Sequence, residues 1–144
     1  MPRKASILIV DDEEKLRHYL KKEFVRKGYE VQDAREGKEA MDLLARECAD
    51  VVLLDICLPG DNGVAVLGKI RKEHPLTRVI MLTGNATVET ALESMKLGAY
   101  DYLTKPYDLD ELCLLIDRAF SESRLRRENY ALQRRFSRES QYDL

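Results

Sequence analysis

Charged and hydroxyl side chains follow or end four apolar runs of this sequence. Asp11 and Asp12 come after SILIV, Asp55 ends VVLLD, Thr83 ends VIMLT, and Lys105 follows YLT. Three carboxylates that lay together would repel one another and raise the pKa of at least one of them, unless a cation joined them. Mg²⁺ prefers oxygen ligands and commonly takes only one or two carboxylates together with a phosphate oxygen. If the acids meet, they therefore predict a site for Mg²⁺ and a phosphoryl group.

The segments that carry these residues alternate between strand-like and helix-like patterns. Five runs are strand-like, and the apolar residues after each run recur at helical spacing. This alternation predicts an α/β fold with a parallel sheet and helices on both faces, in which ligands bind at the carboxyl ends of the strands. We therefore expect the side chains named above at one edge of the sheet. The expected strands are Ser6–Val10, Glu30–Asp33, Val51–Asp55, Val79–Thr83 and Tyr100–Leu103.

Each of these residues also has an ordinary structural interpretation. An Asp pair after a strand often caps a helix, because the helix dipole favours an acid in the first turn. Thr83 fits a β-branched strand position, Lys105 a solvated loop, and Pro106 the stop before a helix. Taken one at a time, none of them would indicate a site. The indication comes from their conjunction at the ends of neighbouring strands.

Composition favours one soluble domain. The 144 residues are 44% hydrophobic, enough for a single core, and the formal net charge of -2 argues against a nucleic-acid-binding surface over the whole domain. The uncharged apolar runs are far shorter than the ~20 residues needed to cross a bilayer, and no leader precedes the first run. The three cysteines lack CxxC spacing, so they suggest neither a disulfide framework nor zinc. We expect a cytoplasmic protein.

Four motifs, in this order and spacing, resemble the receiver domain of two-component response regulators. They are ILIVDDEE, VVLLDICLPGDNG, VIMLTG and YLTKP, and the resemblance covers about residues 5–121. It implies a flavodoxin-like (CheY-like) fold, a doubly wound five-stranded parallel sheet in the order 2-1-3-4-5. It also implies that Asp55 accepts a phosphoryl group from a phosphohistidine of a sensor histidine kinase. The domain itself would be a regulatory phosphoacceptor and not an enzyme.

The resemblance also implies a role for each residue of the site. Asp12 and Asp55 would hold Mg²⁺ together with the backbone carbonyl of Cys57, and Asp11 would act mainly through a metal-bound water. Lys105 would contact the incoming phosphoryl oxygens. Such transfers depend on positioning and charge stabilisation, so a fixed cation opposite the metal is the useful arrangement.

A switch is implied by the same resemblance. The Thr83 hydroxyl would move to a phosphoryl oxygen and leave space for Tyr102 to turn inward. The surface affected would be that of the fourth helix, the fifth strand and the fifth helix, which is also a possible dimer surface. Tyr102 also fits an ordinary half-buried strand position. The Lys105–Pro106 peptide bond is expected to be cis, an isomer that costs little before proline.

The last expected helix is longer than a receiver needs. From Asp108 to about Phe136 the chain has neither Gly nor Pro. Its apolar spacing predicts a short coiled-coil seam with one polar position, and thus a homodimer through a linker helix; a solvated arginine-rich linker is the alternative. We expect a receiver over residues 1–121 and a linker helix over 122–144. The seam residues are Leu125, Asn129, Leu132 and Phe136.

The receiver followed by RRENYALQRRF resembles activators of sigma-54-dependent transcription of the nitrogen-regulator (NtrC) class. There, such a helix leads to an ATPase and a DNA-binding domain, so we expect a regulatory piece of a longer protein that contacts DNA only through its output domain. A haloacid-dehalogenase-like phosphatase would need an Asp where Cys57 stands. A flavin carrier would need a glycine- or hydroxyl-rich phosphate loop where Asp11 and Asp12 stand. The remaining alternative is a receiver-like module that dimerises without being phosphorylated.

Overall fold

The computed structural model describes residues 4–58, 60–84 and 87–142. Its main sheet has five parallel strands in the order β2-β1-β3-β6-β7. Numbered within this sheet along the chain, that is the predicted order 2-1-3-4-5, and each strand begins and ends within one residue of its expected bounds. The strands are β1 Ser6–Val10, β2 Glu30–Ala34, β3 Val51–Asp55, β6 Arg78–Thr83 and β7 Asp101–Thr104.

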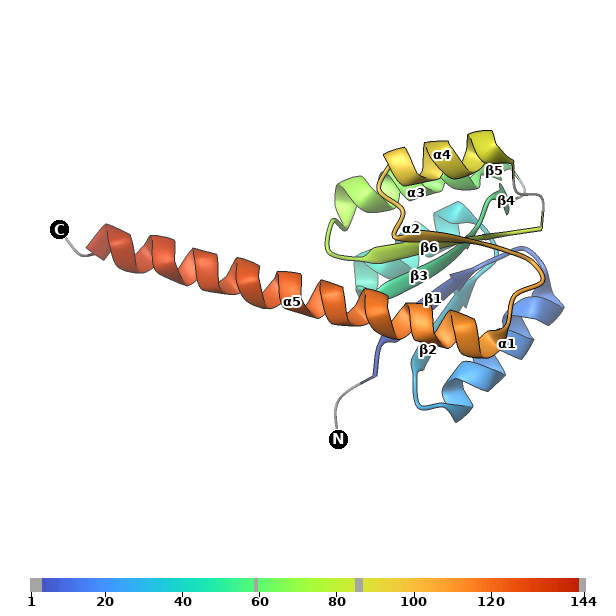
Figure 1. The fold of residues 1–144 in the computed structure, drawn as a ribbon, viewed down its shortest axis with the longest axis horizontal. Coiled ribbons are helices and arrows are strands. Elements are labelled where there is room, and N and C mark those ends of the chain that lie inside the picture. The colour runs from blue at the N-terminus through green and yellow to red at the C-terminus, as the bar shows by residue number, and fades with distance from the viewer. Residues whose placement is uncertain (1–3, 59, 85–86, 143–144) are drawn as a thin grey trace.

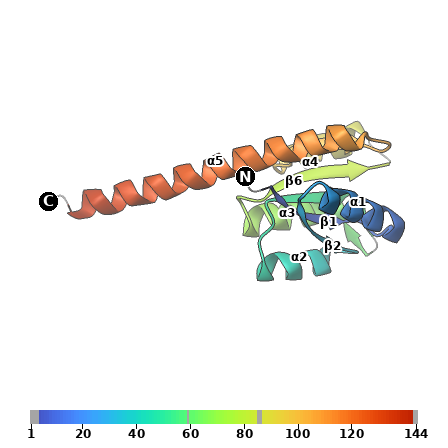
Figure 2. The same ribbon diagram turned by 90° about the horizontal axis from the view of Figure 1, so that it is seen from below.

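Helices cover both faces of this sheet (Figures 1 and 2). One face packs against α1 and the first turns of α5, and the other packs against α2 and α3, with α4 lying next to α3. Ile7 and Ile9 of β1 enter the first core, while Leu8 and Val10 enter the second. Burial on both faces explains why this strand is an unbroken apolar run. The helices are α1 Glu14–Arg26, α2 Gly37–Arg46, α3 Gly63–Glu73, α4 Val88–Lys96 and α5 Leu109–Tyr142.

A two-stranded antiparallel hairpin, β4 (Cys57–Leu58) and β5 (Asp61–Asn62), follows β3. The sequence did not predict it, because strands of two residues are too short to show an alternating pattern. The hairpin returns the chain to β3, where the Gly63 N–H donates a hydrogen bond of 2.8 Å to the Ile56 carbonyl oxygen. It therefore places the start of α3 against the segment that carries Asp55.

The helix α5 begins on the sheet and continues well beyond it (Figure 1, orange to red). Leu112, Ile116 and Ala119 are buried against the first core, whereas Leu125 and Leu132 are exposed. Asn129 is exposed as well, and the side chain of Phe136 lies outside the part of the chain that the structure describes. Among the described residues, no helix combines the length and apolar character needed to span a membrane.

Gly63 begins α3 at a place with no room for a side chain. A Cβ there would overlap the Asp55 carbonyl oxygen and the backbone of Ile56. We expect Gly63→Ala to lower the free energy of unfolding by about 2–3 kcal/mol, because backbone atoms on both sides must shift. Urea denaturation measures this.

Gly68 supplies the matched control in the same helix. A Cβ at Gly68 meets nothing within 4 Å, so Gly68→Ala should raise the free energy of unfolding by about 0.5–1 kcal/mol through helix propensity. Equal effects of the two substitutions would show that α3 does not press on the Asp55 backbone.

Candidate functional site

The ends of two neighbouring strands bring three carboxylates together. Asp11 directly follows β1, and Asp55 is the last residue of β3, which pairs with β1 through Val10 and Leu54. With Asp12, these residues each offer a carboxylate oxygen, and the three oxygens lie within 4.8 Å of one another. Asp11 and Asp55 are buried, and Asp12 is exposed. The acids that the sequence singled out therefore meet at one edge of the sheet.

Asp11 is held by hydrogen bonds through both its backbone and its side chain. Its N–H donates to the Ala34 carbonyl oxygen at 3.1 Å. Its Oδ1 accepts from the Glu13 N–H at 2.9 Å, and its Oδ2 accepts from Lys105 Nζ at 3.0 Å. The orientation of this carboxylate is thus fixed before any ligand arrives.

Lys105 joins the acids from the end of β7. Its Nζ lies 3.0 Å from Asp11 Oδ2 and 3.7 Å from Asp55 Oδ2. Burial alone would lower the pKa of Lys105, but the hydrogen bond and charge of Asp11 and the charge of Asp55 outweigh it, so the pKa is raised. The backbone N–H of Lys105 donates to the Thr83 carbonyl oxygen at 2.7 Å, and the Lys105–Pro106 peptide bond is cis, as predicted. The lysine is therefore a fixed cation at the acid cluster.

Asp55 is anchored by the hairpin that follows it. Its Oδ1 accepts a hydrogen bond of 3.1 Å from the Cys57 N–H. Burial raises the pKa of Asp55, and the charges of Asp11 and Asp12 raise it further; the Cys57 N–H and Lys105 act in the opposite direction without reversing the shift. The Cys57 side chain is exposed and its thiol is free. Folding thus brings negative charge together at a cost that a bound cation would relieve.

Thr83 and Tyr102 lie on the two strands beyond β3. Thr83 is fully buried at the end of β6. Tyr102, in β7, is half-buried, and its hydroxyl lies 3.3 Å from Thr90 Oγ1 in α4. Thr90 also takes part in the capping box at the start of α4, together with Thr87. In this structure the Tyr102 hydroxyl therefore contacts α4.

Sequence reasoning missed three residues around the site. Arg17 is buried beside Asp11, Thr90 contacts Tyr102, and Gly63 touches the backbone of Asp55. A signal for Arg17 was present, because it shares a helical stripe with the buried Leu20 and Phe24. An arginine on that stripe needs a buried partner. Thr90 and Gly63 had no comparable signal, because their contacts depend on how α4 and α3 sit against the sheet.

The donor set suits a hard divalent cation. Three carboxylates supply oxygen atoms at one place, two of them buried, and a single lysine offsets only part of their charge. Oxygen donors of this kind fit Mg²⁺ better than a metal that prefers sulfur or imidazole.

Comparisons with known proteins agree with this geometry. The sequence matches the family described as the response regulator receiver domain over residues 7–117. The regulatory protein AtoC of Escherichia coli is 43% identical over 122 residues, which are 85% of this chain and 26% of AtoC. The DNA-binding transcriptional regulator NtrC of Klebsiella pneumoniae is 38% identical over 113 residues, which are 78% of this chain and 24% of NtrC.

A solved structure supports the same family. The crystal structure of the NtrX receiver domain from Brucella abortus matches with a TM-score of 0.76 and 35% identity, covering 81% of this chain and 98% of that one. This confirms the flavodoxin-like (CheY-like) fold. The chain spans about a quarter of the length of the curated relatives AtoC and NtrC. Because the family match extends over most of its length, the chain belongs to the response regulator receiver family, with relatives of the NtrC, NtrX and AtoC type.

Proposed function

We propose that this receiver is a phosphorylation-controlled switch of a two-component system, in which Asp55 accepts the phosphoryl group. The observation that carries the proposal is the meeting of Asp11, Asp12 and Asp55 with a lysine whose Nζ lies 3.0 Å from Asp11 and 3.7 Å from Asp55. A nucleophile beside a fixed cation and a cluster of oxygen donors is what phosphoryl transfer requires. The domain is regulatory, and its own chemistry is limited to assisting this transfer and the later hydrolysis of the aspartyl phosphate to aspartate and inorganic phosphate.

Transfer would begin with attack of an Asp55 carboxylate oxygen on the phosphorus of a phosphohistidine in a sensor kinase. An oxygen–phosphorus bond forms, the phosphorus–nitrogen bond breaks, and its electron pair returns to the imidazole, which is left neutral after any proton exchange with solvent. The Cys57 N–H donates a hydrogen bond of 3.1 Å to Asp55 Oδ1. This bond would keep the carboxylate in place during the attack. Lys105 would turn to the phosphoryl oxygens and stabilise their charge.

Mg²⁺ is the cofactor that the acids would hold. Asp12 and Asp55 would bind it directly, together with the Cys57 carbonyl oxygen, and Asp11 would act through a water molecule. When bound, Mg²⁺ supplies positive charge that reduces the repulsion between an anionic phosphodonor and the carboxylates. The burial of Asp11 and Asp55 keeps that interaction strong, because screening by water is weaker there.

The experiment that tests this function is phosphorylation by a small donor. The chain is incubated with acetyl phosphate, with Mg²⁺ or with excess EDTA, and its intact mass is measured. We expect one added phosphoryl group with Mg²⁺ and none with EDTA. Equal incorporation in both samples would contradict the role of the metal. No incorporation in either would contradict the phosphoacceptor function and favour a module that acts by dimerisation alone.

Thr83 and Tyr102 are proposed to carry the signal to the surface. Movement of the Thr83 hydroxyl towards a phosphoryl oxygen would open space for Tyr102 to turn inward and lose its 3.3 Å contact with Thr90. That contact links β7 to α4, so its loss would change the surface formed by α4, β7 and α5. The exposed apolar side chains of α4, which would respond, are Val88, Leu92 and Met95.

We propose that the kinase docks beside Lys105. A groove of about 300 Å³ lies there, between α1 and the start of α5. It combines apolar side chains with a direct approach to the reacting centre, as a partner that must present a phosphohistidine requires. Its apolar and aromatic lining consists of Leu16, Tyr19, Leu20, Pro106, Tyr107 and Leu109.

The division of the chain is part of the proposal. Residues 1–121 would form the receiver, and residues 122–144 a linker helix that dimerises through Leu125, Asn129, Leu132 and Phe136. The exposure of Leu125 and Leu132 in the single chain supports this, because two leucines on one helix stripe gain most by packing against a second copy. The α4–β7–α5 surface is a second candidate dimer contact.

Removal of residues 125–144 should weaken self-association. Without the two exposed leucines, the dimer loses apolar burial worth roughly 1.5–3 kcal/mol per side chain, so we expect the dimer dissociation constant to rise by at least about ten-fold. Sedimentation equilibrium measures it. In the full chain, Leu125→Ala with Leu132→Ala should act in the same way, while Gln133→Ala, an exposed neighbour, should not. Unchanged sedimentation of the shortened chain would refute the coiled coil.

The output is proposed by analogy with the relatives. NtrC is described as a DNA-binding transcriptional regulator, and this chain corresponds to about a quarter of it. We propose that this receiver controls a sigma-54-type activator in the cytoplasm, through an ATPase and a DNA-binding domain that are not among these 144 residues.

A further inference from the structure

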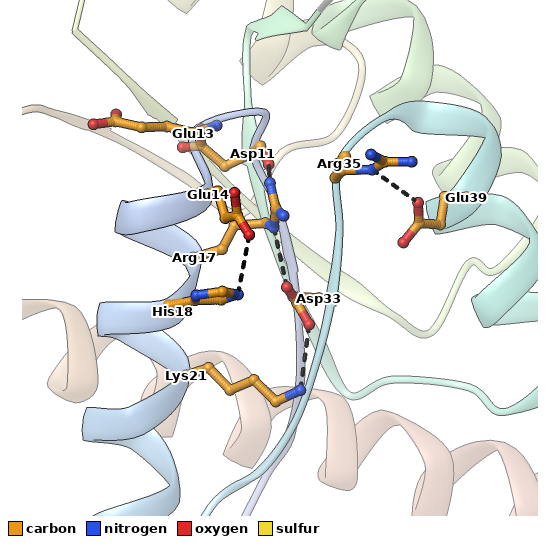
Figure 3. Close-up of polar contacts among 9 residues, drawn as sticks. All are labelled: Asp11, Glu13, Glu14, Arg17, His18, Lys21, Asp33, Arg35 and Glu39. Atoms are coloured by element: carbon orange, nitrogen blue, oxygen red, sulfur yellow. Dashed lines mark hydrogen bonds and ion pairs between the residues drawn. The ribbon is translucent and has the colours of Figure 1, made fainter.

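A buried arginine lies immediately behind the acid cluster. Arg17, in the first turns of α1, has a side chain only 6% exposed. Its Nε donates to Asp33 Oδ2 at 3.0 Å, and its Nη1 donates to the backbone carbonyl oxygen of Asp11 at 2.8 Å (Figure 3). The guanidinium therefore joins three segments: α1, the end of β2 and the turn that carries Asp11 and Asp12.

The contact with the Asp11 carbonyl completes the fixation of that residue. The Asp11 N–H is held by Ala34 of β2, and its carboxylate by the Glu13 N–H and Lys105. The carbonyl oxygen belongs to the peptide that links Asp11 to Asp12. Arg17 thus restrains the peptide plane between the two aspartates, which is one determinant of how their carboxylates lie relative to each other.

Asp33 makes this burial of positive charge possible. It accepts from Arg17 on Oδ2 and from Lys21 Nζ on Oδ1, the latter at 3.3 Å (Figure 3). Burial alone would raise the pKa of Asp33, but the hydrogen bonds of Arg17 and Lys21 lower it, so the carboxylate stays ionised at neutral pH. Asp33 holds one edge of the guanidinium, which leaves the other edge to point at Asp11. The planar guanidinium presents its donors in fixed directions that suit both contacts, whereas a lysine ammonium is a point charge on a flexible stem.

We propose that Arg17, oriented by Asp33, is a positioning residue that fixes the Asp11–Asp12 turn for Mg²⁺ binding and phosphoryl transfer. The inference rests on the proposed function of the acid cluster. Arg17 touches neither the metal nor the phosphoryl group; it acts through the backbone of Asp11. Groups that orient metal ligands in this way typically change metal affinity by roughly 10–100-fold when removed.

The test uses a variant that removes the ion pair without leaving a buried charge. Arg17→Met with Asp33→Asn deletes both partners, since loss of Asp33 alone would leave the buried guanidinium without a carboxylate and would be strongly destabilising. Circular dichroism establishes a temperature at which every variant is folded. At that temperature, Mg²⁺ affinity is measured by calorimetry, and hydrogen exchange of the Asp11 and Glu13 backbone amides is measured in the metal-free protein. We expect Mg²⁺ affinity to fall and amide exchange to accelerate, each by roughly ten-fold or more.

Lys21→Met is the matched control, because it removes the other partner of Asp33 and leaves the Asp11 carbonyl contact intact. It should stay within about two-fold of the wild type in both measurements, and Arg17→Lys should recover only part of the loss. Wild-type Mg²⁺ affinity and exchange in the folded double variant would overturn the inference. If the double variant does not fold, Arg17→Met alone decides by the same criteria, because Asp33 then keeps its ion pair with Lys21; wild-type values would again overturn the inference.

The amide measurement separates this inference from the proposed function. If the wild type binds no Mg²⁺, the proposed function fails. Faster exchange at Asp11 and Glu13 in the double variant would then still support Arg17 as the residue that fixes the turn, and unchanged exchange would overturn it.

Discussion

Asp55→Asn is expected to abolish phosphoryl incorporation. An amide oxygen cannot form the acyl phosphate that the carboxylate forms, so the intact mass should stay unchanged after incubation with acetyl phosphate and Mg²⁺. Asp42→Asn, in the exposed part of α2, removes the same charge far from the cluster and should be phosphorylated like the wild type. A phosphoryl adduct that persists in Asp55→Asn would refute the assignment of the acceptor.

The same substitution should stabilise the metal-free protein. Burial and the charges of Asp11 and Asp12 raise the pKa of Asp55 in the folded chain. The cost of ionising it is therefore absent below the unfolded value of ~3.9, develops as the pH rises through the raised pKa, and is fully present at pH 7. In EDTA at pH 7 we expect Asp55→Asn to raise the free energy of unfolding by about 1–2 kcal/mol, and this gain should shrink as the pH is lowered.

Urea denaturation at several pH values measures that gain. Asp42→Asn should change the free energy of unfolding by no more than about 0.5 kcal/mol. Added Mg²⁺ should stabilise the wild type more than Asp55→Asn, because the metal then relieves repulsion that the variant lacks. A destabilised Asp55→Asn in EDTA would show that the three carboxylates do not strain the fold.

Lys105→Met is expected to slow phosphorylation by about 100-fold without weakening Mg²⁺ binding. In the proposed mechanism the lysine is a fixed donor aimed at charge that develops during transfer, and loss of one such donor typically costs about 10²–10³ in rate, by the same reasoning as for oxyanion holes. Its Nζ donates a hydrogen bond of 3.0 Å to Asp11 Oδ2. Removal of the lysine side chain frees this carboxylate oxygen, so the affinity for Mg²⁺ should be equal to that of the wild type or higher. The time course of intact mass, with calorimetry for the metal, separates the two effects.

Lys27→Met provides a matched lysine for this comparison. Lys27 pairs with Asp110 at 3.4 Å on the surface between α1 and α5, away from the acids. Its removal should leave the phosphorylation rate within about two-fold of the wild type. A wild-type rate in Lys105→Met would contradict the role of Lys105 in transfer.

The sheet could be predicted because burial on both faces leaves a strong signal in the sequence. Val51–Leu54 and Ile7–Val10 are unbroken apolar runs, and both are fully buried strands. A carboxylate at the end of such a buried run lies at the carboxyl edge of the sheet, where it can leave the apolar core. Asp11 and Asp55 could therefore be predicted as neighbours. The residue roles and the cis bond at Pro106 needed the resemblance to receivers, since spacing alone left ordinary alternatives for each.

What was missed depends on contacts between elements. Arg17 lay on a stripe with Leu20 and Phe24, but its partners Asp33 and the Asp11 carbonyl come from other segments. The Tyr102–Thr90 contact depends on how α4 lies against β7. No pattern within a single element encodes such pairings.

The central claim, that Asp55 is the phosphoacceptor, is tested most directly by locating the phosphoryl group. After phosphorylation with acetyl phosphate and Mg²⁺, borohydride reduces an acyl phosphate to an alcohol, which converts the modified aspartate to homoserine. Tandem mass spectrometry of the peptides then identifies the position. We expect homoserine at Asp55 and at no other aspartate. Homoserine at Asp11 or Asp12, with Asp55 unmodified in a protein that carries the phosphoryl group, would contradict the claim.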